Sequence, residues 1–125
     1  MRKLFVGIIA VLLIAACGDS QEGESITGDN VTVQMFDNRF EYTEIVVPEG
    51  GTVTFVGAGR NPHNAVAADG SWSTEDAFDS LELLEGDEAS LSFDTAGEYV
   101  FYCTFHGNAA GDGMAGTLIV EAPGQ

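Results

Sequence analysis

The residues with the most reactive side chains lie close together near the end of the 125-residue chain. The stretch FYCTFHGNAAGDGMAG, residues 101–116, contains a thiol at Cys103, an imidazole at His106 and a thioether at Met114. The chain has one other histidine, His63 in the stretch NPHNAV, and one other cysteine, Cys17, near the N-terminus. Thiol, thioether and imidazole groups are the donors that copper, zinc and similar metal ions prefer.

Two imidazoles and one thiolate in a plane, with a weak axial thioether, form a blue-copper electron-transfer site. Soft sulfur donors favour Cu(I) and imidazoles suit copper as well, so one such site serves both oxidation states. Other readings explain fewer residues. Structural zinc sites use cysteine, histidine and carboxylate rather than methionine, and a Cys103–His106 nucleophile pair leaves His63 and Met114 without a role. A dinuclear copper centre needs a second nearby cysteine, which the sequence lacks.

Short segments of alternating hydrophobicity, separated by Gly, Pro, Asn and Asp, predict an all-β domain. The predicted strands are 31–36, 44–47, 51–56, 89–94, 98–103 and 117–121. With seven or eight strands and at most one short helix, starting near Ser73, the chain is expected to form a β-sandwich.

These strands position the candidate ligands. Tyr99, Phe101 and Cys103 share one face of strand 98–103, so the thiol should point into the sandwich near one end. We expect His106 on the loop just beyond that strand. A hairpin-like return over residues 103–116 should then bring Met114 back to Cys103, and His63 should follow strand 51–56 on a separate loop.

The same stretches resemble a known family. The pattern YCxxH followed by GMxGxLxV is similar to the copper loop of plastocyanin-like cupredoxins, and NPHNAV is similar to their upstream histidine motif. The resemblance extends over about residues 31–121. In general character the chain resembles the small blue-copper cupredoxins of bacteria and archaea, such as auracyanin and halocyanin.

The resemblance implies a Greek-key, cupredoxin-like sandwich that binds one type 1 copper ion through His63, Cys103, His106 and Met114. It also implies that Asn64 hydrogen-bonds Thr104 and ties the two ligand loops together. Such a protein is a monomeric carrier of single electrons between redox partners, such as cytochromes or membrane complexes, and is not an enzyme. The alternatives are a copper-handling protein without electron transfer and a structural sandwich with a vestigial site.

One feature departs from the family pattern. Seven residues, Gly107 to Gly113, separate His106 from Met114, which is more than in plastocyanin-type loops. We expect the extension to alter the surface around His106 and to influence the choice of redox partner.

The N-terminus predicts export. Residues 1–16 combine two basic residues with an apolar run too short to span a bilayer, which needs about 20 residues as a helix, and this is typical of a signal peptide. The segment LIAAC resembles a bacterial lipobox that ends in a lipidated Cys17. Residues 17–30 are then a flexible acidic tether and residues 31–122 the cupredoxin domain, held at the outer face of the cytoplasmic membrane or in the periplasm. An ordinary signal peptide or an uncleaved anchor are the alternatives.

The charge of the predicted mature chain is strongly negative. Without residues 1–16 it has twenty acidic residues against two arginines, a net charge of −18. This charge disfavours nucleic acid and anionic headgroups as partners, and it would steer a basic protein toward the domain. Solubility or adaptation to a saline habitat explains it equally well. With Cys17 lipidated, Cys103 is the remaining thiol, so no internal disulfide is expected.

Overall fold

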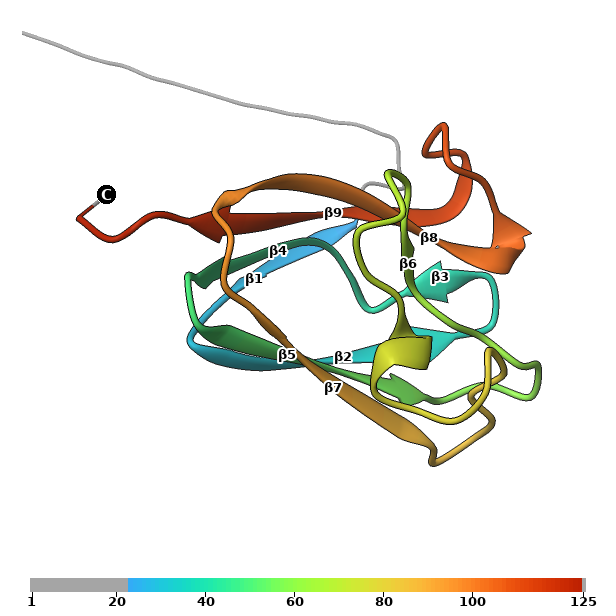
Figure 1. Cartoon of the computed structure of the whole chain (residues 1–125). Helices are drawn as coiled ribbons and strands as arrows, with labels where there is room; N and C mark the ends of the chain where they lie inside the picture. The colour runs from blue at the N-terminus through green and yellow to red at the C-terminus, as the bar shows by residue number, and fades with distance from the viewer. Residues whose placement is uncertain (1–22, 125) are drawn as a thin grey trace, which may run out of the picture.

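The computed structural model describes residues 23–124, and strands of this range form a sandwich of two sheets (Figure 1). One sheet has the order β1 (Glu24–Thr27), β4 (Tyr42–Pro48), β9 (Gly113–Glu121), β8 (Gly97–Gly107) and β6 (Val66–Ala67). The other has the order β3 (Arg39–Phe40), β2 (Asn30–Phe36), β5 (Gly51–Gly57) and β7 (Glu88–Phe93). The predicted all-β, Greek-key sandwich is confirmed, with nine strands in the described range rather than seven or eight.

Part of the segment predicted to be a tether belongs to the sheet. Strand β1 lies within residues 17–30 and pairs in parallel with β4, from Glu24 opposite Tyr42 to Thr27 opposite Val46. The strand is mostly exposed and contributes only Ile26 to the edge of the core. The position of β1 therefore depends on backbone pairing with β4, and such pairing leaves no hydrophobic alternation in the sequence from which it could be predicted. The folded part of the chain thus begins before residue 31, the predicted boundary.

The alternation of the sequence matches the burial of the strands. In β5 every second residue is buried, and β2 and β7 follow the same period. Between the sheets, four aromatic rings form the centre of the core. The ring of Phe101 lies 4.8 Å from that of Phe40, 5.8 Å from Phe55 and 5.9 Å from Trp72.

The only helical turn of the described residues is a 3-10 turn, η2 (Thr74–Asp76). Ser73 caps it: its hydroxyl accepts from the Glu75 N–H, while the Asp76 carboxylate accepts from the Ser73 N–H. The short helix predicted to start near Ser73 is therefore present as a single turn.

Between residues 23 and 124, no helix is long and apolar enough to cross a membrane. The predicted signal peptide, residues 1–16, and the predicted lipidation site, Cys17, lie outside the described residues.

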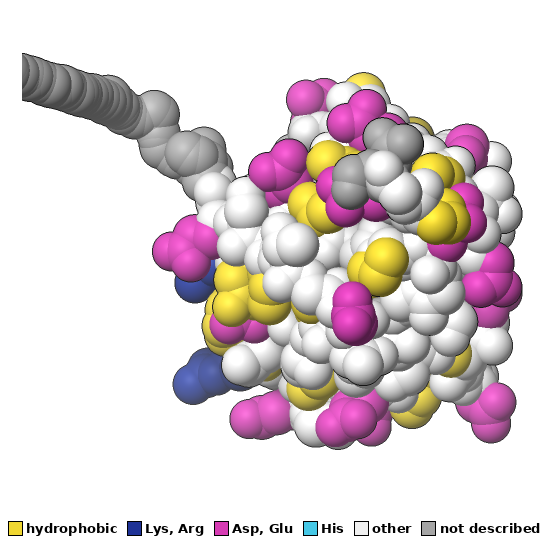
Figure 2. All heavy atoms as spheres, turned by 90° about the vertical axis from the view of Figure 1, so that its left-hand side faces the viewer, with side chains coloured by type: hydrophobic (Ala, Val, Ile, Leu, Met, Phe, Trp, Pro, Cys, Tyr) yellow, Lys and Arg dark blue, Asp and Glu magenta, His cyan; other side chains and the backbone are white. Residues whose placement is uncertain are grey.

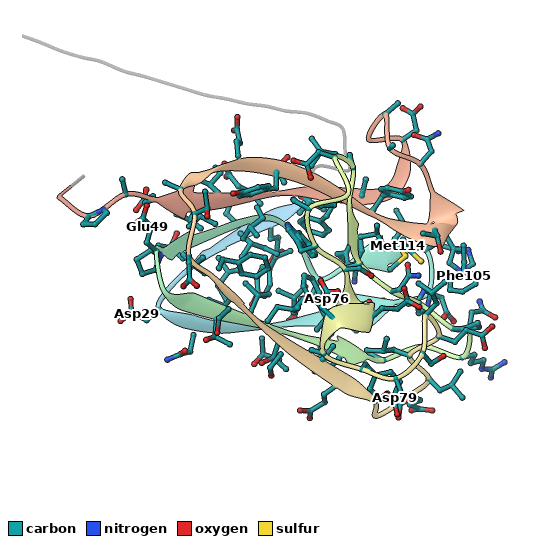
Figure 3. All side chains as sticks on the ribbon, viewed as in Figure 1. Asp29, Glu49, Asp76, Asp79, Phe105 and Met114 are labelled. Atoms are coloured by element: carbon teal, nitrogen blue, oxygen red, sulfur yellow. The ribbon has the colours of Figure 1, made fainter. Side chains whose placement is uncertain are left out.

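The two ends of the sandwich differ. Met114 and Phe105 lie at one end, and Asp29 and Glu49 lie at the other (Figure 3). Figure 2 shows the end remote from Met114, where acidic side chains are scattered singly among small hydrophobic patches. On this face the negative charge is dispersed rather than gathered into one patch.

Candidate metal centre

The β8–β9 hairpin carries three of the four predicted ligands at an irregularity in its pairing. Tyr102 is opposite Ala115 and Gly107 is opposite Gly113, so residues 103–106 of β8 face only Met114 of β9. Such a bulge re-aims side chains and is common next to functional sites. The sequence analysis expected His106 on the loop beyond the strand. In the structure it lies within the bulged end of β8.

The neck of this hairpin is made of glycine for steric reasons. A side chain on Gly113 would overlap the carbonyl oxygen of His106, and the backbone φ of Gly113 is +73°. Gly116, opposite Phe101, has a similar constraint, because a Cβ there would lie 2.7 Å from the Phe101 ring. The GMxG spacing thus lets β9 approach β8 closely on both sides of Met114.

His63 reaches the same end of the molecule from the connection between β5 and β6. Its backbone forms two hydrogen bonds with Leu83, with its N–H donating to the Leu83 carbonyl at 3.1 Å and its carbonyl accepting at 2.9 Å. The side chain is fully buried. The backbone of His63 is thereby fixed against a neighbouring segment.

Cys103 and His63 meet although 40 residues separate them. The Sγ of Cys103, itself fully buried, lies 3.9 Å from Nδ1 of His63. A nitrogen ligand lies about 2.0 Å and a thiolate about 2.3 Å from a metal such as zinc, so two such donors on one trigonal ion stand ~3.7 Å apart. The spacing of the thiol and the imidazole therefore fits a shared metal ion.

His106 lies beside this pair. Its ring centroid is 5.0 Å from that of His63, with the planes tilted by 52°. Its Nε2 is buried and lacks a hydrogen-bond partner among the described residues. Within residues 23–124, no three His, Cys, Asp or Glu side chains are already arranged to hold a metal ion. The χ2 torsion of histidine is broad and roughly two-fold, so a turn of the ring can present either nitrogen to the site.

Met114, the fourth predicted ligand, is 1% exposed and faces the four-residue bulge of β8. Its side chain lies at the Phe105 end of the sandwich (Figure 3). This end of the molecule thus contains the buried imidazole of His63, the thiol of Cys103 and the thioether of Met114. With the unpartnered imidazole nitrogen of His106, they form a donor set that fits copper. The observed donors agree with this metal better than with a hard cation such as magnesium, which takes oxygen ligands.

Asn64 and Thr104 join the two ligand segments through two hydrogen bonds. The Asn64 amide donates to the Thr104 hydroxyl at 2.9 Å, and its Oδ1 accepts from the Thr104 N–H at 2.8 Å. Asn64 is fully buried. Since the two residues directly follow His63 and Cys103, these bonds restrain the separation of the two ligands.

Replacing Asn64 with alanine should lower the stability of the copper-free protein. The variant would lose both hydrogen bonds of the fully buried Asn64 amide, and two such bonds together contribute about 1–3 kcal/mol. Urea unfolding measures the difference. As a matched control, Ser90→Ala removes an exposed side-chain hydrogen bond to Thr54 and should change stability by at most about 0.5 kcal/mol. Equal midpoints for the two variants would show that Asn64 does not restrain the ligand segments.

Asp37 is a site residue that the sequence analysis missed. It lies in the turn between β2 and β3, and its Oδ1 is 3.0 Å from Nε2 of His63. Hydrogen bonds from the backbone N–H of Asn61, from the His63 ring and from the Arg60 N–H lower the pKa of the Asp37 carboxyl to about 2. In the sequence Asp37 is one of twenty acids, and only the fold brings it to His63, 26 residues away.

The extended loop between His106 and Met114 has its own hydrogen bonds. The Asn108 Oδ1 accepts from the N–H groups of Ala110 and Asp112, and the Asn108 N–H donates to the Asp112 carbonyl. Residues 111–115 also form one wall of an open groove of about 850 Å³, whose other wall includes Arg39 and Glu41. The extension is thus an ordered projection at the site end of the molecule.

Comparisons with known proteins identify a family of copper-binding proteins. The sequence model of a family described as copper binding proteins, plastocyanin/azurin family, matches residues 28–121. A plastocyanin of Scenedesmus fuscus is 34% identical over 66% of this chain and 86% of its own. The solved amicyanin of Paracoccus versutus is 26% identical, with a TM-score of 0.57 over 74% of this chain and 82% of its own.

A solved copper-containing nitrite reductase of Thermus scotoductus is 31% identical, with a TM-score of 0.59 over 74% of this chain. This chain spans only 22% of that enzyme, so the likeness concerns one part of it. The family match covers most of the chain and includes every residue of the donor set. With a two-sheet sandwich that buries an imidazole against a thiol at one end, the chain belongs to the plastocyanin/azurin family of copper-binding proteins, whose members hold one type 1 copper ion.

Proposed function

We propose that the protein is an exported electron carrier that binds one type 1 copper ion through His63, Cys103, His106 and Met114. The observation that carries the proposal is the contact of 3.9 Å between Cys103 Sγ and His63 Nδ1, both in fully buried side chains. When bound, copper accepts and releases one electron at a time. The proposal involves no substrate whose bonds are made or broken, so the protein is not an enzyme.

Each ligand has a distinct part in the proposal. Cys103 would supply the covalent path from the metal into strand β8, and the thioether of Met114 would be the weak donor that tunes the reduction potential. His106 is partly buried and adjoins Phe105, which is 41% exposed, with their ring centroids 6.4 Å apart. An electron would therefore leave through His106 and across the apolar surface at Phe105. Asn64 and Thr104 hold the two ligand segments in register.

Redox partners with a basic docking face fit the charge of the domain. The acidic excess attracts such a partner over long range and raises the rate of encounter at low salt. Cytochromes and membrane electron-transfer complexes are the partner classes that we propose. The ordered projection over residues 107–113 lies beside His106, so we expect it to influence which of these partners can dock.

Rapid mixing of the copper-loaded protein with c-type cytochromes of different surface charge tests the proposal. We expect a reversible one-electron exchange whose rate falls as salt is added, with basic cytochromes reacting fastest. Zinc-loaded protein is the control, because zinc has no redox chemistry. If the chain releases its copper on reduction, or binds it without exchanging electrons, the protein handles copper instead.

A lipid anchor at Cys17 is a separate part of the proposal. The LIAAC segment supports it, with the signal peptide of residues 1–16 removed before lipidation and the chain held at the outer face of the cytoplasmic membrane or in the periplasm. Metabolic labelling with a radioactive fatty acid should mark the wild type and not a Cys17→Ala variant. Equal labelling of both would show that Cys17 is not the lipidated residue.

A further inference from the structure

We propose that Asp37 is a positioning residue that fixes the His63 ring with Nδ1 toward Cys103 and favours Cu(II) over Cu(I). This inference rests on the proposed ligand set. Its starting point is the two-sided placement of the His63 ring, whose Nε2 lies 3.0 Å from Asp37 Oδ1 while Nδ1 lies 3.9 Å from Cys103 Sγ. Because the ring is fully buried, neither of its nitrogens can hydrogen-bond to bulk water.

The hydrogen bonds of Asp37 determine which nitrogen of His63 carries the proton. An ionised carboxylate can only accept, and Asp37 already accepts from the backbone N–H groups of Asn61 at 3.1 Å and Arg60 at 3.2 Å. The His63 Nε2 must therefore donate to Oδ1. In a neutral imidazole the other nitrogen, Nδ1, then has a free lone pair, and this is the nitrogen that faces Cys103.

The position of Asp37 is itself restricted. The following residue, Asn38, adopts a φ of +73° in the tight turn between β2 and β3. On the other side, a Cβ on Gly59 would lie 2.6 Å from the Asp37 Cγ and 2.8 Å from its backbone nitrogen, so a side chain there would displace the carboxylate. Together with the backbone bonds of His63 to Leu83, these restraints orient the imidazole before a metal ion binds.

An anionic partner on the far side of a ligating imidazole has an electronic effect as well. A carboxylate that accepts from the outer N–H orients the ring and raises the basicity of the ligating nitrogen. The added negative charge stabilises the more positive Cu(II) more than Cu(I). The side chain of Asp37 is 34% exposed, so solvent reduces this effect without removing it. Asp37 should therefore lower the reduction potential of the centre.

Two substitutions separate the hydrogen bond to His63 from the charge. Asp37→Ala removes both, whereas Asp37→Asn keeps an oxygen that can accept from Nε2 and removes the charge, together with the oxygen that accepts from the Arg60 N–H. Asp69→Asn is the matched control, because Asp69 also accepts from a nearby backbone N–H, that of Ser71, and its hydrogen bonds involve neither histidine.

The measurements are the ring nitrogen NMR shifts of His63 in the copper-free protein, the Kd for Cu(II) and Cu(I), and the reduction potential. We expect the wild type and Asp37→Asn to hold the Nε2–H tautomer and Asp37→Ala to lose it. Asp37→Ala should weaken Cu(II) binding about 10–100-fold and Cu(I) binding less. For each factor of ten by which Cu(II) binding is weakened more than Cu(I) binding, the one-electron reduction potential rises by about 59 mV. The potential of Asp37→Asn should rise by a smaller amount.

The proposal is overturned if Asp37→Ala keeps the Nε2–H tautomer, or if its potential shifts no more than that of Asp69→Asn. Should Asp37→Ala fail to fold, Asp37→Asn decides: an unchanged potential overturns the electronic part of the proposal, and a raised potential supports it. The tautomer is read without copper or an electron partner. A wild type that does not exchange electrons would therefore contradict the proposed function while the assignment of Asp37 stands.

Discussion

Replacing Cys103 with serine should remove the blue colour that we expect of the copper-loaded protein. The colour of such centres comes from the bond between copper and a thiolate, and a serine hydroxyl does not ionise at neutral pH to replace it. Cys103 is the only thiol in the described part of the chain, so no other thiolate of residues 23–124 can take its place. Visible absorption after addition of one equivalent of Cu(II) measures the effect, and we expect complete loss of the band.

Serine also places a hydroxyl in a fully buried position, which costs about 1–3 kcal/mol when the hydroxyl lacks a partner. Ala67→Ser is the control for that cost, since Ala67 is 2% exposed and lies in β6 of the same sheet. The control should lose stability and keep its colour. A blue Cys103→Ser variant would rule out Cys103 as the copper thiolate.

Replacing Phe101 with alanine should give the largest loss of stability among single core substitutions. The ring is fully buried and contacts the rings of Phe40, Phe55 and Trp72 at the centre of the sandwich. Truncation of a buried phenylalanine typically costs about 3–5 kcal/mol, against a total free energy of unfolding of about 5–15 kcal/mol for a small domain. Denaturant unfolding of the copper-free protein measures the loss.

The same strand provides the control. Val100 precedes Phe101 in β8 and is 40% exposed, so Val100→Ala should change stability by at most about 0.5 kcal/mol. Phe101 also lies two residues before Cys103, and a cavity beneath it should loosen the strand that carries the thiol. If both variants unfold at the same denaturant concentration, the aromatic cluster is not the centre of the core.

Much of the fold and of the candidate site could be predicted because both depend on local patterns. The alternation of β2, β5, β7 and β8 has the period of a half-buried strand, and the observed burial follows it. The placement of Cys103 on the inner face follows from Tyr99 and Phe101, four and two residues before it. The resemblance also indicated the hydrogen bonds between Asn64 and Thr104, which the structure contains.

The remaining features depend on contacts between distant segments. Strand β1 is held by backbone pairing to β4 and has almost no hydrophobic pattern of its own. The bulge that includes His106 in β8 arises from a shift of register against β9, and a single strand's sequence does not encode the shift. Asp37 is equivalent to the other surface acids until the β2–β3 turn brings it to His63. In each case the feature depends on a second segment of the chain, and the local sequence does not show which segment that is.

X-ray absorption spectroscopy of the copper-loaded protein tests the central claim most directly, because it counts the atoms bound to the metal. We predict one copper ion per chain, with two imidazole nitrogens and one short copper–sulfur distance, together with a weaker, longer sulfur contribution from Met114. The sulfur signal at short distance should vanish in Cys103→Ser, and one imidazole should be lost in His63→Ala. A copper ion surrounded only by nitrogen and oxygen atoms in the wild type would contradict the account.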